Sequence, residues 1–262
     1  MTFRDLHHEG DLPLLLPNAW DVASALAFAD AGFPAVGTTS FGIAAAAGEP
    51  DGGRAGKDGT RTLARRLSRL PVYISADIED GYAEDPEQVA EYAAGLGVDG
   101  VNLEDSSAGR LVDPALHAAK VAAVKRRAPG LFVNARVDTY WLGQDAGVDA
   151  SLARALAYVE AGADGIFFPG ATAPDDLRAL TARTPVPVNV LLVPGRTLAE
   201  LAELGVRRVS TGSLPYRAAV DAAVAVAAGF RDGGTPPRAT PYATMQRRLA
   251  RHQDASAARE GA

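Results

Sequence analysis

The stretch of the chain that decides the fold is VYISADIEDGY, at residues 72–82. A short apolar run, typical of a buried strand, ends there in three acidic residues and a glycine. A second copy of the pattern, GVNLED, follows at residues 100–105, and LFVNARVD at residues 131–138 ends in an arginine beside an acid. If these strands are parallel neighbours, their polar ends meet at one edge of the sheet.

The acidic strand ends need a positive partner. Two carboxylates about 4 Å apart repel each other by roughly 4 kcal/mol at an effective dielectric constant of about 20. Asp77, Glu79 and Glu104 would therefore need a divalent metal, a proton or Arg136 between them. Because the candidate ligands are all oxygens, the pattern favours Mg²⁺ or Mn²⁺ over zinc.

Apolar runs and amphipathic helical stretches alternate along the chain. The runs are residues 14–17, 35–39, 72–76, 100–103, 131–135, 165–168, 186–191 and 208–210. Helices are predicted at residues 21–31, 86–96, 114–127, 149–161, 174–182 and 197–204. This alternation predicts an α/β fold, specifically a (β/α)₈ TIM barrel. An open doubly wound sheet is the alternative, but no GxGxxG turn follows the first strand.

Composition favours one large domain with a C-terminal addition. The 262 residues are 47% hydrophobic, and no linker-like break interrupts the repeating units. After Gly229 the chain becomes polar and rich in proline and glycine, and a helix is predicted at residues 242–252. We therefore place the barrel domain at residues 1–228 and a helical extension and tail at residues 229–262.

Charge and cysteine content exclude several classes of function. The net charge of −6 leaves no basic footprint, which argues against nucleic acid and anionic membranes as partners. The N-terminus has no signal-type apolar core, and no apolar run approaches the ~20 residues of a membrane span. We therefore expect a cytoplasmic protein. The lack of cysteine excludes disulfides, thiolate zinc sites and cysteine nucleophiles.

In a barrel of this kind, chemistry takes place at the C-terminal ends of the strands. Acids gather at the middle strand ends, together with the single arginine Arg136. A metal held between carboxylates, with Arg136 gripping a carboxylate or phosphonate, would suit a small molecule rich in oxyanions. The plainer reading of the acids is helix capping, and Arg136 could instead form a rim salt bridge to Glu104 or Asp138.

Six ordered motifs carry a resemblance to a known family. They are NAWD at residues 18–21, GEPDG at 48–52, DIEDGY at 77–82, VNLED at 101–105, NARVD at 134–138 and VNVLLVPG at 188–195. Together they resemble the isocitrate lyase/phosphoenolpyruvate mutase superfamily. The resemblance implies a (β/α)₈ barrel that binds Mg²⁺ and an α-oxycarboxylate, in a homodimer or homotetramer whose subunits exchange the last barrel helix. Members make or break C–C or P–C bonds beside a carboxylate through an enolate-like intermediate.

The resemblance also implies roles for single residues. Asp77 falls on the direct metal ligand, and three further acids fall on positions that hold the metal mostly through water: Asp51, Glu79 and Glu104. Arg136 falls on the arginine that contacts substrate oxygens. Thr39, Ser40 and Phe41 fall where the family uses a hydroxyl and backbone N–H groups to hold the substrate carboxylate and the enolate oxygen. Asn189 falls on a polar position on the substrate side.

The chain also departs from the family pattern. Isocitrate and methylisocitrate lyases carry a Lys-Lys/Arg-Cys-Gly-His gating loop whose cysteine supplies a proton, whereas residues 106–113 here read SSAGRLVD. A cysteine-dependent isocitrate lyase is therefore excluded. The lysine and asparagine of the phosphonopyruvate mutase loop are missing, and FFPG at residues 167–170 replaces the family's glutamate or histidine. The nearby candidates for moving a proton are Arg110, Tyr82, Ser106 and Ser107.

These observations predict a Mg²⁺-dependent lyase that cleaves a C–C bond in a 2-oxo or 2-hydroxy carboxylate through an enolate-like intermediate. Its candidate catalytic residues are Arg136, Glu104, Arg110 and Tyr82. One alternative is P–C bond chemistry on phosphonopyruvate- or phosphoenolpyruvate-type substrates. The other is a non-catalytic, metal-binding family member that lacks the acid of the gating loop.

Overall fold

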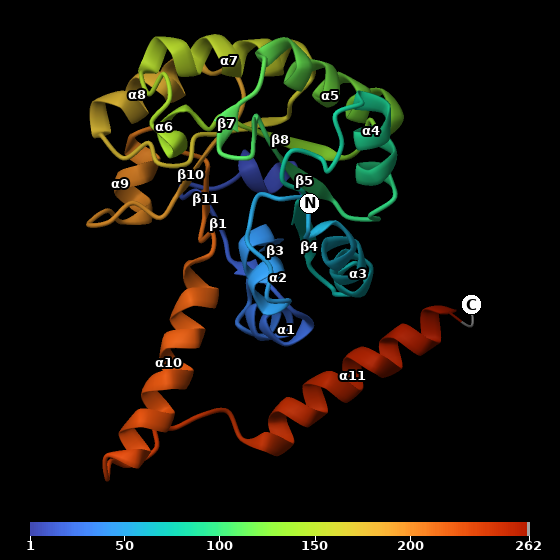
Figure 1. Ribbon diagram of the computed structural model, residues 1–262, viewed down its shortest axis with the longest axis vertical. Coiled ribbons are helices and arrows are strands. Elements are labelled where there is room, and N and C mark those ends of the chain that lie inside the picture. The colour runs from blue at the N-terminus through green and yellow to red at the C-terminus, as the bar shows by residue number, and fades with distance from the viewer. Residues whose placement is uncertain (261–262) are drawn as a thin grey trace.

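The computed structural model describes residues 1–260 and confirms the predicted TIM barrel (Figure 1). Its strands are β1 (Leu14–Leu16), β2 (Asn18–Ala19), β3 (Ala35–Thr38), β4 (Tyr73–Asp77), β5 (Gly100–Glu104), β6 (Ser106–Ser107), β7 (Arg110–Leu111), β8 (Phe132–Arg136), β9 (Gly165–Phe167), β10 (Val188–Leu191) and β11 (Arg208–Ser210). Its helices are α1 (Val22–Asp30), α2 (Ser40–Ala46), α3 (Lys57–Leu67), α4 (Pro86–Ala94), α5 (Pro114–Arg127), α6 (Thr139–Leu142), α7 (Val148–Glu160), α8 (Pro174–Arg183), α9 (Leu198–Glu203), α10 (Leu214–Arg231) and α11 (Tyr242–Glu260), with a short 3₁₀ turn at Asp5–His7.

The main sheet is parallel throughout and curves into a nearly closed barrel. Its order is β1-β11-β10-β9-β8-β5-β4-β3-β2. The first strand is interrupted at Pro17, which has no N–H to donate to a strand ladder, although its carbonyl accepts a bond of 2.8 Å from the Gly37 N–H. One half of that strand, β1, pairs with β11, and the other half, β2, pairs with β3. The two halves therefore bring the ends of the sheet together.

The strands and helices predicted for the barrel form within two residues of their expected ends, whereas α2, α3, α6 and α10 were not predicted. Local signals explain the helix starts. Asp85 accepts a hydrogen bond from the Glu87 N–H (3.1 Å), and Asp113 accepts one from the Ala115 N–H (2.8 Å). In both cases the next residue is proline, which fits the first helical position because no N–H is needed there.

The N-terminal end of the barrel is plugged. Phe3 and His7 pack on Phe132 at ring distances of 5.4 and 4.2 Å, and Leu14 and Leu16 join the same apolar cluster. The larger apolar core lies between the strands and the outer helices, including α4, α5, α7 and α8. The interior of the barrel is therefore reached from the C-terminal ends of its strands.

The last two helices project from the barrel (Figure 1). No residue of α10 is buried, and the boundary predicted between residues 228 and 229 falls inside this helix. The predicted helix at residues 242–252 forms as α11 and continues to Glu260. An ion pair of 2.5 Å between Arg248 and Asp30 connects α11 with α1.

The helices described in residues 1–260 include none that combines the length and the apolar character required to span a membrane.

Candidate active site

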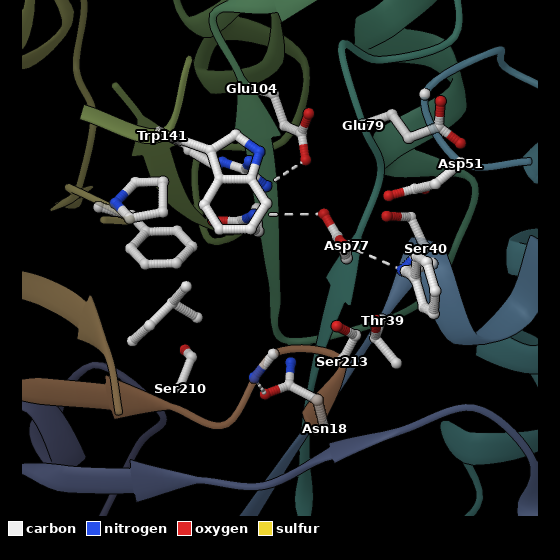
Figure 2. A pocket seen from close by; sticks show the side chains of 18 of the residues that line it. Asn18, Thr39, Ser40, Asp51, Asp77, Glu79, Glu104, Trp141, Ser210 and Ser213 are labelled. Atoms are coloured by element: carbon white, nitrogen blue, oxygen red, sulfur yellow. Dashed lines mark hydrogen bonds and ion pairs between the residues drawn. The ribbon is translucent and has the colours of Figure 1, made fainter. Parts of the chain in front are cut away.

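A cavity of about 560 Å³ lies at the C-terminal ends of the strands. Four carboxylates point toward it from one side: Asp51, Asp77, Glu79 and Glu104 (Figure 2). Apolar side chains also line it: Trp141, Phe167, Pro169, Leu191 and Leu192. The cavity could therefore hold a small molecule with one strongly polar end.

The turn after β4 brings its acids to the cavity. Gly81 has φ +90°, and an added Cβ would lie 2.5 Å from a methyl carbon of Val89, so glycine is required there. Glu79 adopts φ 48°, which is uncommon for a residue with a side chain. The sharp turn that starts at Asp77 thus aims both Asp77 and Glu79 into the same space.

The orientation of Asp77 is fixed by its neighbours. Its Oδ2 accepts a bond from the Ser40 N–H (3.0 Å), and its Oδ1 accepts one from Asn102 Nδ2 (3.2 Å). Asn102 Oδ1 in turn accepts from Asn134 Nδ2 at 3.0 Å. This relay crosses β4, β5 and β8, and it holds the carboxylate in one rotamer beneath the cavity.

Arg54 ties the loop that carries Asp51 to the end of β4. The Arg54 N–H donates to Glu79 Oε2 at 3.0 Å, while its guanidinium contacts both oxygens of Asp80 through Nε (3.1 and 3.0 Å). Nη2 adds a contact of 2.5 Å to Asp80. Asp80 therefore braces the loop, and Asp51 is held near Glu79 (Figure 2).

The carboxylates are arranged for a cation. Burial, together with the charges of Asp77 and Asp51, raises the pKa of Glu79 to about 7, and burial and Asp77 raise the pKa of Asp51. Glu79 Oε1 is buried without a hydrogen-bond partner. Positive charge at this point would favour the ionised forms of both acids.

The donor set fits Mg²⁺ rather than a metal enclosed by protein ligands. Among the side chains described, those of residues 1–254, no three of His, Cys, Asp or Glu come close enough to form a direct metal cage. Mg²⁺ usually keeps several waters and takes only one or two carboxylates. Asp77 could be the direct ligand, with Asp51, Glu79 and Glu104 acting through water, as the sequence resemblance implied.

Arg136 lines the cavity and is held in place by two ion pairs. Its Nη1 donates to Glu104, and its Nε donates to Asp138 at 2.6 Å. The rings of Trp141 and Phe167 lie 5.6 and 5.7 Å from its Cζ. Burial alone would lower the pKa of Arg136, but the carboxylates reverse this and raise it. Burial raises the pKa of Glu104 against the opposing effect of Arg136.

Three of the predicted substrate-binding residues besides Arg136 line the cavity, and the fourth, Asn189, is buried behind other residues. Thr39, Ser40 and Phe41 line the cavity, and Thr39 caps α2 by accepting from the Gly42 N–H at 3.4 Å. Asn189 is buried, is not among the lining residues described, and donates to Ser210 Oγ at 3.1 Å.

The candidates for moving a proton are not placed alike. Tyr82 is buried, is not among the residues that line the cavity, and shares a hydrogen bond of 3.0 Å between its hydroxyl and that of Thr60. Arg110 is exposed on β7. Ser106 and Ser107 line the cavity, and Ser106 donates to Asp138 at 2.6 Å. The geometry gives no support to Tyr82 or Arg110 as a proton donor.

Sequence reasoning missed several residues that shape the cavity: Ser75, Trp141, Leu191, Leu192 and Arg208. Trp141 lies on the short α6, whose four residues are too few to give a periodic signal. Arg208 opens a three-residue strand, so its direction into the barrel could have been read from strand alternation once the strand was placed.

Fold and site together define a barrel with an acidic cavity, lined also by Arg136, at the C-terminal ends of its strands. The chain matches the family described as phosphoenolpyruvate phosphomutase over residues 3–231. It therefore belongs to the isocitrate lyase/phosphoenolpyruvate mutase superfamily, as the sequence resemblance predicted.

Similar proteins span several activities. The uncharacterized protein Rv1998c of Mycobacterium tuberculosis is 54% identical, over 97% of this chain and 98% of that protein. The 2-methylisocitrate lyase of Bacillus subtilis is 32% identical, over 71% of this chain and 64% of the enzyme. A candidate phosphonomutase from Burkholderia cenocepacia J2315 is 42% identical, with a TM-score of 0.80 over 86% and 97% of the two chains. A phosphonopyruvate hydrolase, solved with oxalate and Mg²⁺, shares the fold at 24% identity, with a TM-score of 0.79 over 99% and 98%.

Proposed function

We propose that the protein is a Mg²⁺-dependent lyase that cleaves a C–C bond in a 2-oxo or 2-hydroxy carboxylate and stabilises the enolate left by cleavage. The observation that carries this proposal is that Asp77, Asp51 and Glu79 point into one cavity, which Arg136 also lines. Bound Mg²⁺ would supply Lewis-acid polarisation of the oxygen on which negative charge develops.

The chain's own residues would position the substrate. Arg136 presents a planar guanidinium that can grip two oxygens of a carboxylate. Glu104 and Asp138 hold that guanidinium in place, so the grip needs little rearrangement. The Ser40 N–H donates to Asp77 at 3.0 Å and would hold that carboxylate in place for the metal.

The hairpin of β6 and β7 occupies the place of the missing gating loop. Gln144 holds it from both sides, accepting from the Leu111 N–H (3.2 Å) and donating to the Gly109 carbonyl (2.9 Å). Ser106 through Gly109 already line the cavity. A short loop in place over the site supports catalysis rather than the non-catalytic alternative.

P–C bond chemistry is the second candidate, because the family match and the 42% identical neighbour both concern phosphonate enzymes. A phosphoryl group carries several charges and needs a basic pocket. The wall beside Arg136 is formed by Trp141 and Phe167, which suits a carbon leaving group. We therefore rank C–C cleavage first. Two further arginines, Arg208 and Arg217, also line the cavity, so the phosphonate alternative stays in the test below.

We further propose that the protein works as a homodimer or homotetramer that exchanges α10 between subunits. The support is that α10 buries no residue within its own chain and exposes Val220, Val224 and Phe230. Light scattering on the full chain would give the mass, and a monomer would exclude the exchange.

The function is tested by incubating the protein with 2-oxo acids, citrate-like acids and phosphonates in Mg²⁺. Release of pyruvate or glyoxylate that is lost in EDTA and in Asp77→Ala is the expected result. Phosphate release would instead establish the phosphonate alternative. A protein that binds Mg²⁺ but turns over nothing in the panel would favour the non-catalytic alternative.

A further inference from the structure

Arg208 forms the floor of the cavity and is only 3% exposed. Its Nε donates to Ser210 Oγ at 3.3 Å on its own strand, and its Nη2 donates to Ser75 Oγ at 3.4 Å on β4. Strands β11 and β4 are not neighbours in the sheet. The guanidinium therefore crosses the barrel interior between the N-terminal plug and the acidic site.

This buried charge is poorly compensated. A guanidinium has five N–H donors, yet the two contacts of Arg208 are long and its Nη1 has no partner. Among the side chains described, those of residues 1–254, no carboxylate forms an ion pair with Arg208, whereas Arg136 pairs with two carboxylates and the half-buried Arg154 with one. Burial lowers the pKa of Arg208 to about 9, and the charge of Asp77 only partly opposes this.

We propose that Arg208, with the hydroxyls of Ser75 and Ser210, is a carboxylate-binding subsite at the floor of the cavity. A buried cation without a counterion is costly, and an anion that enters the cavity would remove that cost. The guanidinium fork matches the two oxygens of a carboxylate, and the Ser75 hydroxyl can rotate to donate a further bond. The Ser210 hydroxyl donates to Asn189 Oδ1 at 3.3 Å and accepts from Arg208, so it helps to orient the guanidinium.

The subsite is separate from the metal position but reaches it through the same cavity. Ser75 precedes Asp77 by two residues on β4, which corresponds to a rise of about 6.6 Å along the strand. The carboxylate could be a free small acid, or the far end of a molecule whose other end is held at Asp77 and Arg136. Only the second source rests on the proposed function.

Formate is the probe for the subsite itself. Calorimetric titration of the metal-free, full-length protein with formate, at low and constant ionic strength, should show saturable binding. Arg208→Met should weaken formate binding by at least about tenfold, because charge-assisted bonds are lost. Arg208→Lys keeps the charge but not the fork, so we expect an intermediate affinity. Arg183→Met, which removes an exposed arginine on α8 paired with Asp149, is the matched control and should bind formate normally.

The two sources are separated in the presence of Mg²⁺. If a substrate bridges both positions, malate should bind more tightly than lactate to the wild type, and Arg208→Met should abolish that preference. If the occupant is a free acid, malate and lactate should bind alike, and formate should bind alongside oxalate without competition.

Either pattern supports the subsite. No formate binding by the wild type, or equal binding by the wild type and Arg208→Met, would overturn it. If Arg208→Met does not fold, unchanged formate binding by Arg208→Lys would overturn it instead. Failure of Mg²⁺-dependent oxalate binding would contradict the proposed function but leave the formate result standing.

Discussion

Replacing Arg136 with lysine should affect both stability and ligand binding. Arg136 is 12% exposed in its side chain and bonds two carboxylates, Glu104 and Asp138. A lysine ammonium could keep one of these contacts, so the variant loses one charge-assisted hydrogen bond, about 1.5–3 kcal/mol. For a chain of this size, each kcal/mol lowers the melting temperature by about 2–4 °C, which gives a decrease of about 3–12 °C.

The same substitution should weaken the binding of oxalate, whose adjacent oxygens imitate a pyruvate enolate. Loss of a two-point guanidinium contact should cost oxalate a similar 1.5–3 kcal/mol, which is about 10- to 100-fold in affinity. The assay is calorimetric titration with oxalate in Mg²⁺, alongside thermal melting of the metal-free protein.

Arg154→Lys is the control. Arg154 is also 12% exposed, pairs with Asp105 at 2.6 Å and donates to the Val112 carbonyl, but it does not line the described cavity. It should melt lower and bind oxalate normally. If Arg136→Lys behaves in the same way, Arg136 is a structural rim residue and the substrate clamp must be sought elsewhere.

Three further predictions concern other parts of the molecule. Arg54→Ala releases the loop braced by Asp80, so calorimetry should show Mg²⁺ affinity about 10- to 100-fold weaker; unchanged affinity would refute the bracing role. Burial, assisted by the charge of Arg208, lowers the pKa of His7 from 6.5 to about 3. The folded protein should therefore lose stability as the pH falls below 6.5. In melting experiments between pH 6.5 and about 4, His7→Phe should lose less stability than the wild type, and an identical profile would contradict this. Tyr82→Phe and Arg110→Ala should keep the wild-type rate, because neither side chain is part of the described cavity lining, and a large rate loss in either would restore it as a proton donor.

The fold could be predicted because its signals are local. Apolar runs and amphipathic periods each act within a few residues, so the strands and six of the helices around them could be predicted to within two residues. The carboxyl ends of neighbouring parallel strands lie at the same edge of the sheet, and this rule alone predicts that Asp77, Glu79, Glu104 and Arg136 lie together. The interruption at Pro17 was missed, because pairing of one strand with two distant partners is not a local property.

The rest of the site depends on contacts across the barrel. Arg208 on β11 contacts Ser75 on β4, and these strands lie far apart in sequence. The sequence alone therefore does not reveal that Arg208 lines the cavity or that it lacks a carboxylate partner. The burial of Tyr82 depends likewise on its packing near Tyr92 and Thr60. Such long-range packing decides which polar residues near a strand end actually reach the site.

The central claim is that Asp77 holds a divalent metal at which an enolate-like ligand binds. Calorimetric titration of oxalate into the wild type and Asp77→Ala, each with Mg²⁺ and with EDTA, tests it most directly. With saturating formate present in every titration to fill the Arg208 subsite, we predict binding of one oxalate per chain only to the wild type in Mg²⁺. Equal oxalate binding in all four experiments, or binding that survives in Asp77→Ala with Mg²⁺, would contradict the account.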